Sequence, residues 1–187
     1  RNIDVHVTRT KLRPLANNEI PQTRAFLYFI LQCLGGLIVL ACLPQRCWPL
    51  GIIGLVLLAI YPFMKRITHW PQLVLGFAFN LGVIFGVVAV LPYKAIHWFP
   101  VLCLYGAGIA WTLGYDTIYA LQDKADDLKI GVKSTAIYFG ESIKVALFLI
   151  YSLVFASLTL VGYWENVSGI FYSILGIGFF ITVVMLY

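Results

Sequence analysis

Six long apolar runs, separated by short polar stretches, dominate this 187-residue sequence. A helix needs about 20 apolar residues to cross ~30 Å of hydrocarbon, with a range of about 17–25. The runs cover residues 25–43, 50–64, 72–92, 98–115, 144–163 and 170–187, and the second is short for a span. They lack the alternating polar positions of a barrel strand. The pattern therefore predicts an all-α, polytopic membrane helical bundle with about six transmembrane helices, in a single domain over residues 1–187.

Composition and charge placement agree with a membrane protein. The chain is 61% hydrophobic and only 11% charged, which excludes an ordinary soluble domain. The loops 1–24, 65–71 and 116–144 together carry eleven of the thirteen Lys and Arg residues and seven of the eight acids. This bias predicts that their face is cytoplasmic, or on the matrix side, in a bacterial or mitochondrial inner membrane. Membrane lipid is an expected partner, and nucleic acid is not, because charge placement matters here more than the basic pI near 9.1.

The most informative polar stretch is residues 115–134, which holds four of the eight acidic residues. If the preceding helix continues at about 100° per residue, Asp116, Asp123 and Asp127 lie on one stripe, at about 0°, 340° and 20°. Three carboxylates so close repel one another unless a cation joins them. Mg²⁺ prefers such oxygen ligands, so the stretch predicts a magnesium site. The alternative is a solvated loop without a chemical role, although ionisable groups at membrane spans are functional by default.

Two further polar stretches on the same face bring basic side chains. In residues 1–15, Asp4 precedes Arg9, Lys11 and Arg13, and residues 61–72 contain Lys65 and Arg66. Arginine offers a fixed fork to phosphate or carboxylate, and lysine offers a mobile point charge. The basic segment can instead hold anionic lipid, and Lys65 and Arg66 can be ordinary helix-end charges. The convergence of three stretches favours an anion site.

Two polar or aromatic positions within and beside the spans leave alternatives open. Asn80 interrupts an apolar run, where a buried amide either bonds to a neighbouring helix or lines a substrate pocket. Tyr119, like Trp111 and Tyr115, can stack on a flat or cationic ligand, but aromatics at this spacing are more often packing or interface residues.

Taken together, the three polar stretches resemble the UbiA superfamily of intramembrane prenyltransferases, over essentially the whole chain. Within that superfamily the resemblance is to the members that prenylate 4-hydroxybenzoate for ubiquinone biosynthesis. It is carried by Asp4 with residues 7–15, by residues 61–72, and above all by residues 115–120, 123–127 and 131–135.

The resemblance implies two aspartate-rich loops that bind Mg²⁺ and the diphosphate of a polyprenyl diphosphate donor. The expected reaction joins the polyprenyl group to the ring of 4-hydroxybenzoate, ortho to the phenol, and releases diphosphate. The expected metal ligands are Asp4, Asp123 and Asp127, with Asp116 as a further candidate. The expected catalytic residues are Asp123, Asp127 and Arg66, of which Arg66 would hold the acceptor carboxylate and Asp123 would assist removal of the phenolic proton. The expected substrate-binding residues are Arg9, Lys11, Arg13, Lys65, Arg66, Asn80, Tyr119 and Lys133.

The chain departs from the family pattern at its start. The family's first motif has an asparagine and another aspartate ahead of Asp4, and the full family fold has nine helices. We therefore expect this chain to be a fragment, with two spans before Arg1 and one after Tyr187. Alternative functions are prenyl transfer to homogentisate, a naphthoate or a porphyrin, and, in a different class, cation transport. A transporter should hold its acids near the middle of the bilayer, whereas these lie at one mouth.

Overall fold

The computed structural model describes residues 10–187, so Asp4 and Arg9 lie outside the described residues. Within that range the secondary structure is helical, with no strand. The α-helices are α1 (Gln22–Cys42), α2 (Trp48–Ile67), α3 (Pro71–Val90), α4 (Trp98–Leu121), α5 (Lys124–Ile130), α6 (Thr135–Phe139), α7 (Ile143–Trp164) and α8 (Gly169–Leu186), and the short 3-10 helices are η2 (Gln45–Cys47), η3 (Tyr93–Ala95) and η4 (Gly140–Ser142).

Each of the six predicted apolar runs forms one long helix. Five segments of the described chain are long and apolar enough to cross a membrane, namely Gln22–Cys42, Gln45–Ile67, Pro71–Val90, Thr135–Trp164 and Gly169–Leu186. The remaining predicted span corresponds to α4, which has 24 residues and is not among these five segments. The all-α membrane fold is thus confirmed, and the chain is an integral membrane protein.

Several helices extend beyond the predicted apolar runs, most clearly the second one. The apolar run 50–64 is short for a span, but α2 has 20 residues. Pro49 fits in the first turn, where its missing N–H costs nothing. Lys65 and Arg66 lie in the last turn, where positive charge interacts favourably with the helix dipole. Residues beyond the apolar run therefore extend the helix at both ends.

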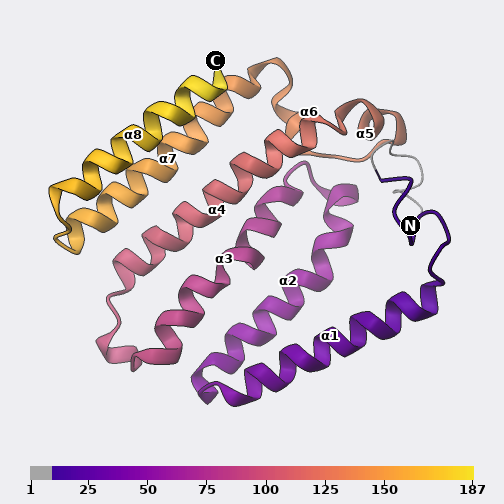
Figure 1. Cartoon of the computed structure of the whole chain (residues 1–187), viewed down its shortest axis with the longest axis horizontal. Coiled ribbons are helices and arrows are strands. Elements are labelled where there is room, and N and C mark those ends of the chain that lie inside the picture. Colours follow the sequence, from indigo (N-terminus) through magenta and orange to yellow (C-terminus); the bar gives the residue numbers. More distant parts are fainter. Residues whose placement is uncertain (1–9) are drawn as a thin grey trace.

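The long helices form a row in which each one packs against its neighbours in sequence (Figure 1). Helix α2 contacts α3, α3 contacts α4, α4 contacts α7, and α7 contacts α8. Short connections between successive helices make these neighbours antiparallel. Helix α1 meets α2 at the turn that joins them and then diverges from it (Figure 1). The small helices α5 and α6 lie near each other at one end of the long helices, next to the end of α4 (Figure 1).

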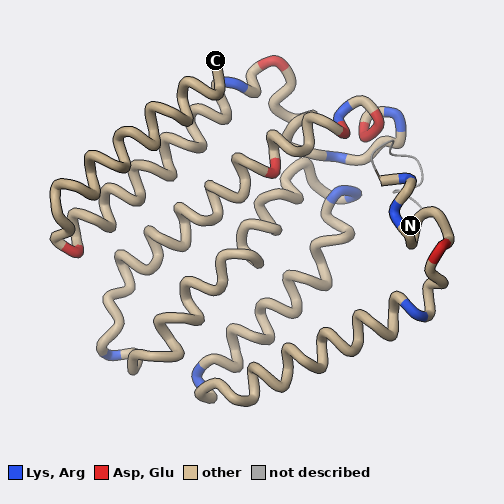
Figure 2. The backbone as a smooth tube through the Cα atoms, in the orientation of Figure 1, with Lys and Arg blue, Asp and Glu red and all other residues tan. Residues whose placement is uncertain are grey.

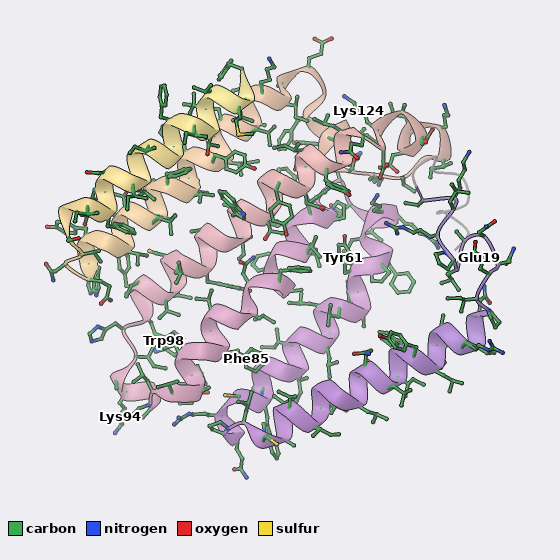
Figure 3. The ribbon with its side chains drawn as sticks, in the orientation of Figure 1. Glu19, Tyr61, Phe85, Lys94, Trp98 and Lys124 are labelled. Atoms are coloured by element: carbon green, nitrogen blue, oxygen red, sulfur yellow. The ribbon has the colours of Figure 1, made fainter. Side chains whose placement is uncertain are left out.

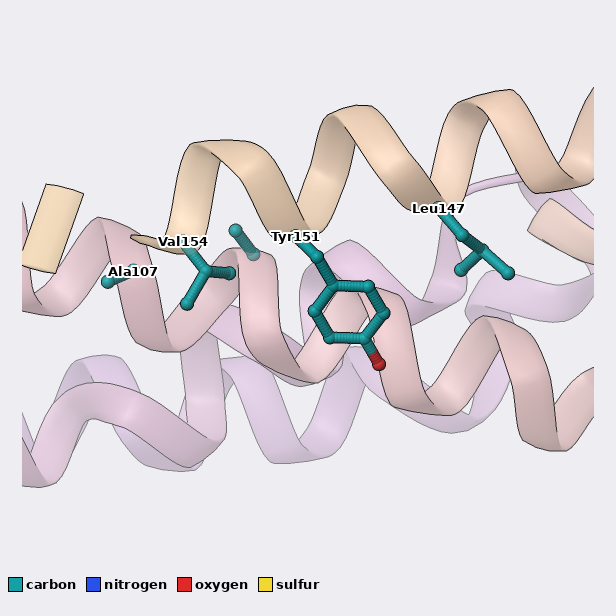
Figure 4. Close-up of a cluster of buried hydrophobic side chains, with 5 residues drawn as sticks. Ala107, Leu147, Tyr151 and Val154 are labelled. Atoms are coloured by element: carbon teal, nitrogen blue, oxygen red, sulfur yellow. The ribbon is translucent and has the colours of Figure 1, made fainter. Parts of the chain in front are cut away.

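The contact between α4 and α7 contains a buried apolar cluster. Ala107 on α4 lies near Val154 on α7, and Tyr151 and Leu147 follow farther along α7; all four are buried (Figure 4). In contrast, α1, α2 and α8 bury none of their residues within the described chain. Their large apolar side chains suit contact with lipid or with further helices.

Charged residues gather at the helix ends, whereas the middle parts of the helices are almost uncharged (Figure 2). Lys124 and Lys94 lie at opposite ends of the long helices (Figure 3). The end that holds α5 and α6 carries most of the charge, and the opposite end holds Arg46, Lys94 and Glu165. Within the described residues, the polar loops 10–24, 65–71 and 116–144 therefore lie at the same end of the long helices.

Candidate active site

The acidic stretch does not form the single helix that the stripe of three carboxylates requires. Helix α4 ends at Leu121, and α5 begins at Lys124 after a turn through Gln122 and Asp123. The predicted continuous stripe is therefore wrong. Aspartate favours positions just before and at the start of a helix, because carboxylates there interact well with free N–H groups and the helix dipole. Asp116 stays on α4, separated from Asp123 and Asp127 by the break.

The carboxylate of Asp127 is the most unusual group of the site. Its side chain is 1% exposed, and neither of its oxygens has a hydrogen-bond partner in the described part of the chain. Its ion-pair partner is the Lys65 ammonium, whose Nζ lies 3.6 Å from Oδ2. Burial raises the pKa of Asp127 above its ordinary value, Lys65 opposes the increase, and the negative charges of Asp123 and Asp126 add to it.

A buried carboxylate without hydrogen bonds is costly unless a cation compensates it. Asp123 is also buried, at 6% exposure, and it is close enough to Asp127 to influence its pKa. Two neighbouring buried carboxylates are a donor set that suits a hard cation such as Mg²⁺. However, residues 10–187 contain no cluster of three or more His, Cys, Asp or Glu side chains placed to hold a metal. The predicted third ligand, Asp4, lies outside that range.

The segment after α5 is tied to the end of α2 through Lys133. Its backbone N–H donates to the Lys65 carbonyl at 2.8 Å, and its Nζ donates to the Ile67 carbonyl at 3.2 Å. These carbonyls belong to the last turn of α2, which has no intrahelical donors for them. Lys133 therefore caps α2 through both its backbone and its side chain.

Three fully buried polar side chains join the same segment to α3 and α4. The hydroxyls of Thr117 on α4 and Thr135 on α6 lie 2.6 Å apart. The backbone N–H of Thr135 donates to Oε1 of Gln72 on α3, at 3.4 Å. All three residues are at most 2% exposed. None of them is among the predicted site residues. Polar residues at the ends of apolar runs are the sequence feature that could have pointed to them.

Helix α6 also packs through aromatic rings against the turn between α2 and α3. The ring of Trp70 lies 5.3 Å from that of Tyr138 and 5.5 Å from that of Phe139. At its start, the Ser134 hydroxyl accepts a hydrogen bond from the Ile137 N–H, as an N-cap residue does. The acidic loop is thus anchored on its C-terminal side by several independent contacts.

Other predicted site residues lie at the same charged end. Arg66 is exposed, and it makes no hydrogen bond or ion pair with the rest of the described chain. Lys11 and Arg13 are exposed in the turn-rich segment before α1, and Tyr119 is 50% exposed near the end of α4. Their predicted roles toward substrate remain predictions.

The structure gives Asn80 the interhelical bond that the sequence left as one of two interpretations. Its amide nitrogen donates to the Thr112 hydroxyl on α4 at 3.0 Å and to the Gly76 carbonyl on its own helix at 2.8 Å. The side chain lies against Gly108, where any Cβ would overlap with the amide group. Asn80 therefore joins α3 to α4, and its predicted contact with substrate remains untested.

Comparison with known proteins places this geometry in a family. The chain is 44% identical over 177 residues to a protein of Drosophila melanogaster named "4-hydroxybenzoate polyprenyltransferase, mitochondrial", and the match covers 95% of this chain and 45% of that protein. It is 44% identical over 154 residues to the "4-hydroxybenzoate octaprenyltransferase" of Legionella pneumophila (strain Corby), covering 81% of this chain and 53% of the relative. A protein of the same name from Tolumonas auensis is 40% identical over 184 residues, covering 97% and 63%.

The chain thus spans about half the length of these relatives. No solved structure matches it. The family described as "UbiA prenyltransferase family" matches residues 1–187, the whole sequence. The chain belongs to the UbiA prenyltransferase family.

Proposed function

We propose that the full-length protein containing this chain transfers a polyprenyl group from polyprenyl diphosphate to 4-hydroxybenzoate, in ubiquinone biosynthesis. The observation that carries the proposal is the buried Asp127, with Asp123 and Lys65 beside it, at the charged end of an apolar helical row. A diphosphate with a lipid tail requires this combination, because its charged head needs cations and its tail needs an apolar surface. The names of the relatives support the choice of acceptor.

We propose Mg²⁺ as the cofactor, held by Asp123 and Asp127 together with Asp4, and with Asp116 as a further candidate. The support is that Asp127 is buried without a hydrogen-bond partner in residues 10–187. When bound, the metal would supply Lewis-acid stabilisation of the departing diphosphate. It usually takes only a few protein carboxylates and fills its octahedron with water and phosphate oxygens, so two or three acids suffice.

The basic side chains of the charged end would bind the diphosphate. Lys65 pairs with Asp127, Lys133 lies at the C-terminal side of the acidic loop, and Arg9, Lys11 and Arg13 are the remaining candidates. Negative charge grows on the leaving group as the allylic C–O bond breaks. Cations that are already positioned there stabilise the transition state more than the ground state, which raises the rate.

Arg66 would orient the acceptor. Its guanidinium is exposed next to Lys65, and a planar fork matches the carboxylate of 4-hydroxybenzoate. As the C–O bond of the donor breaks and diphosphate leaves, the ring carbon ortho to the phenol forms a bond to the isoprenoid carbon, and the proton of that ring carbon then passes to the phenolic oxygen as the ring becomes aromatic again. Asp123, which is buried, would assist removal of the phenolic proton. Asn80 and Tyr119 are the remaining candidates for substrate contact.

The charge bias supports an orientation with the site in the cytoplasm or mitochondrial matrix. Relatives include a protein named as mitochondrial and bacterial proteins, so an inner membrane of either kind is the proposed location. The apolar helices would accept the polyprenyl chain, which water does not solvate.

The test replaces single carboxylates in the full-length protein. Asp127→Asn and Asp123→Asn remove a charge with little change of shape, so we expect each to lower Mg²⁺-dependent product formation at least ~100-fold. Glu141→Gln, an exposed carboxylate at the same end, is the matched control and should keep its activity. Near wild-type turnover of Asp127→Asn at limiting Mg²⁺ would contradict the assignment. An acceptor panel with homogentisate, a naphthoate and a porphyrin distinguishes the alternative substrates.

A further inference from the structure

We propose that Gln72, Thr117 and Thr135 form a polar clasp that positions the acidic loop for its ligands. These three residues, named the clasp, bond to one another and not to Asp123 or Asp127 within the described chain, so they are positioning residues and not catalytic ones. The proposal rests on the proposed function, since it assigns to the clasp the task of aligning the loop's carboxylates.

The clasp closes the loop at its base. The hydrogen bond of 2.6 Å between the hydroxyls of Thr117 and Thr135 joins positions 18 residues apart. Three acidic residues, Asp123, Asp126 and Asp127, lie between those two positions. Closing a loop reduces its conformational freedom, so residues 118–134 sample fewer positions than the same segment would without the bond.

Gln72 fixes the clasp to a third helix. Its Oε1 accepts the backbone N–H of Thr135 at 3.4 Å, so α3, α4 and α6 meet at one point. The three residues are 0–2% exposed, and a buried polar group that loses its partner is destabilising. The folded protein is therefore more stable when both hydrogen bonds of the clasp are formed.

The clasp lies between elements that carry the proposed ligand groups. Thr117 directly follows Asp116 on α4, and Thr135 follows Lys133 by two residues. Lys133 in turn donates hydrogen bonds to the carbonyls of Lys65 and Ile67. Lys65 is also the ion-pair partner of Asp127. A shift of Thr135 would also shift Lys133 and its contacts with the end of α2, and would change the distance from Lys65 to Asp127.

The chemistry of the clasp suits positioning. Hydroxyl and amide groups are neutral, so they hold the loop without competing with Asp123 and Asp127 for a cation or with Lys65 for a diphosphate. Mg²⁺ demands near-ideal octahedral geometry, and sites of that kind depend on supporting residues that hold the ligands in place. A loose loop would therefore weaken binding before it altered the reaction step.

The experiment compares Thr135→Val, Thr117→Val and the double variant in the full-length protein. Valine keeps the branched shape and removes the hydroxyl. We expect amide hydrogen exchange in residues 118–134 to become roughly tenfold faster in each, since one buried hydrogen bond is lost. The double variant should show little more than either single variant, because both remove the same bond. Exchange in α7 and α8 should not change.

Two controls separate positioning from a general loss of stability. Thr135→Ser keeps the hydroxyl and should exchange within about twofold of the wild type. Thr182→Val removes a hydroxyl that donates only to the Gly178 carbonyl of its own helix, and the loop should be unaffected. Equal acceleration in every helix, an unchanged loop, or Thr135→Ser behaving as Thr135→Val would overturn the clasp.

Kinetics test the functional half of the proposal. Thr135→Val should raise the KM for polyprenyl diphosphate and the Mg²⁺ concentration for half activity several-fold, with a smaller fall in kcat. Thr135→Ser should restore both values. If exchange changes as expected while neither value moves, the clasp is only structural and the inference fails. If the wild type transfers no prenyl group at all, the proposed function fails instead, and the exchange result still reports on the clasp.

Discussion

Replacing Gly108 by alanine should show whether Asn80 serves helix packing. A Cβ at Gly108 would overlap with Oδ1 of Asn80 and approach its Cγ to 2.6 Å. The Asn80 side chain would have to turn away and give up its bond to the Thr112 hydroxyl. Gly106 lies two residues earlier on the same helix, and a Cβ added there would meet no atom within 4 Å, so Gly106→Ala is a matched control.

The expected energies can be worked out from these contacts. Overpacking costs about 1–3 kcal/mol, and a hydrogen bond between membrane helices contributes about 0.6 kcal/mol, up to ~1.7. Helix propensity favours alanine over glycine by about 1 kcal/mol in both variants. Gly108→Ala should therefore be less stable than Gly106→Ala by about 2–3 kcal/mol. For 150–250 residues that unfold together, the difference corresponds to about 4–12 °C in Tm.

Thermal unfolding of the detergent-solubilised full-length protein measures the difference. Asn80→Ala combined with Gly108→Ala should recover most of the lost Tm, because the overlapping atoms are gone. Asn80→Ala alone should lower Tm slightly and leave both KM values within about twofold, since one interhelical bond is weak. The same Tm for the two glycine variants would refute the packing argument. A large rise in KM for Asn80→Ala, without a change in Tm, would assign Asn80 to substrate.

Three further expectations follow from individual contacts. Lys65→Met should destabilise the protein by about 1–3 kcal/mol, because it leaves Asp127 buried without its cation, and the 36% exposure of Lys65 limits the loss. Adding Asp127→Asn should recover most of the lost Tm in a double-mutant cycle. Independent effects of the two substitutions would contradict the ion pair. Arg66→Ala should raise the KM for 4-hydroxybenzoate at least ~10-fold more than that for an uncharged phenol, and equal losses would assign Arg66 to the diphosphate or the fold. Gly131→Ala should lower Tm by the equivalent of about 1 kcal/mol, because Gly131 ends α5 at φ +71°; Gly176→Ala, whose added Cβ meets no atom within 4 Å and whose backbone is ordinary, should not.

Much of the fold could be predicted because membrane helices follow from local sequence. Each apolar run became a helix, since the backbone in lipid must satisfy its own hydrogen bonds. The shared face of the polar loops could also be predicted, because an even number of crossings returns the chain to the same side. Asp123 and Asp127, which the acidic pattern singled out, are buried, and their predicted chemical roles stay predictions.

The break between α4 and α5 could not be predicted from helical periodicity. A periodic pattern assumes one continuous helix, whereas Gln122 and Asp123 form a turn, and the chain returns toward α4 in the segment between α5 and α6 (Figure 1). Local propensity permitted either conformation. Contacts of residues 131–139 with α2, α3 and α4 favour the turn, and those contacts join residues far apart in the sequence.

The sequence by itself determined the helical membrane architecture, the charged face and which acids are candidates for the site, because hydropathy and charge are properties of single residues and short runs. Only the tertiary structure decided which cation pairs with Asp127, that Lys133 caps α2, and that Asn80 bonds to Thr112. Each of these depends on how two helices are turned and how close they lie. That geometry results from packing across the whole row of helices, which no local pattern encodes.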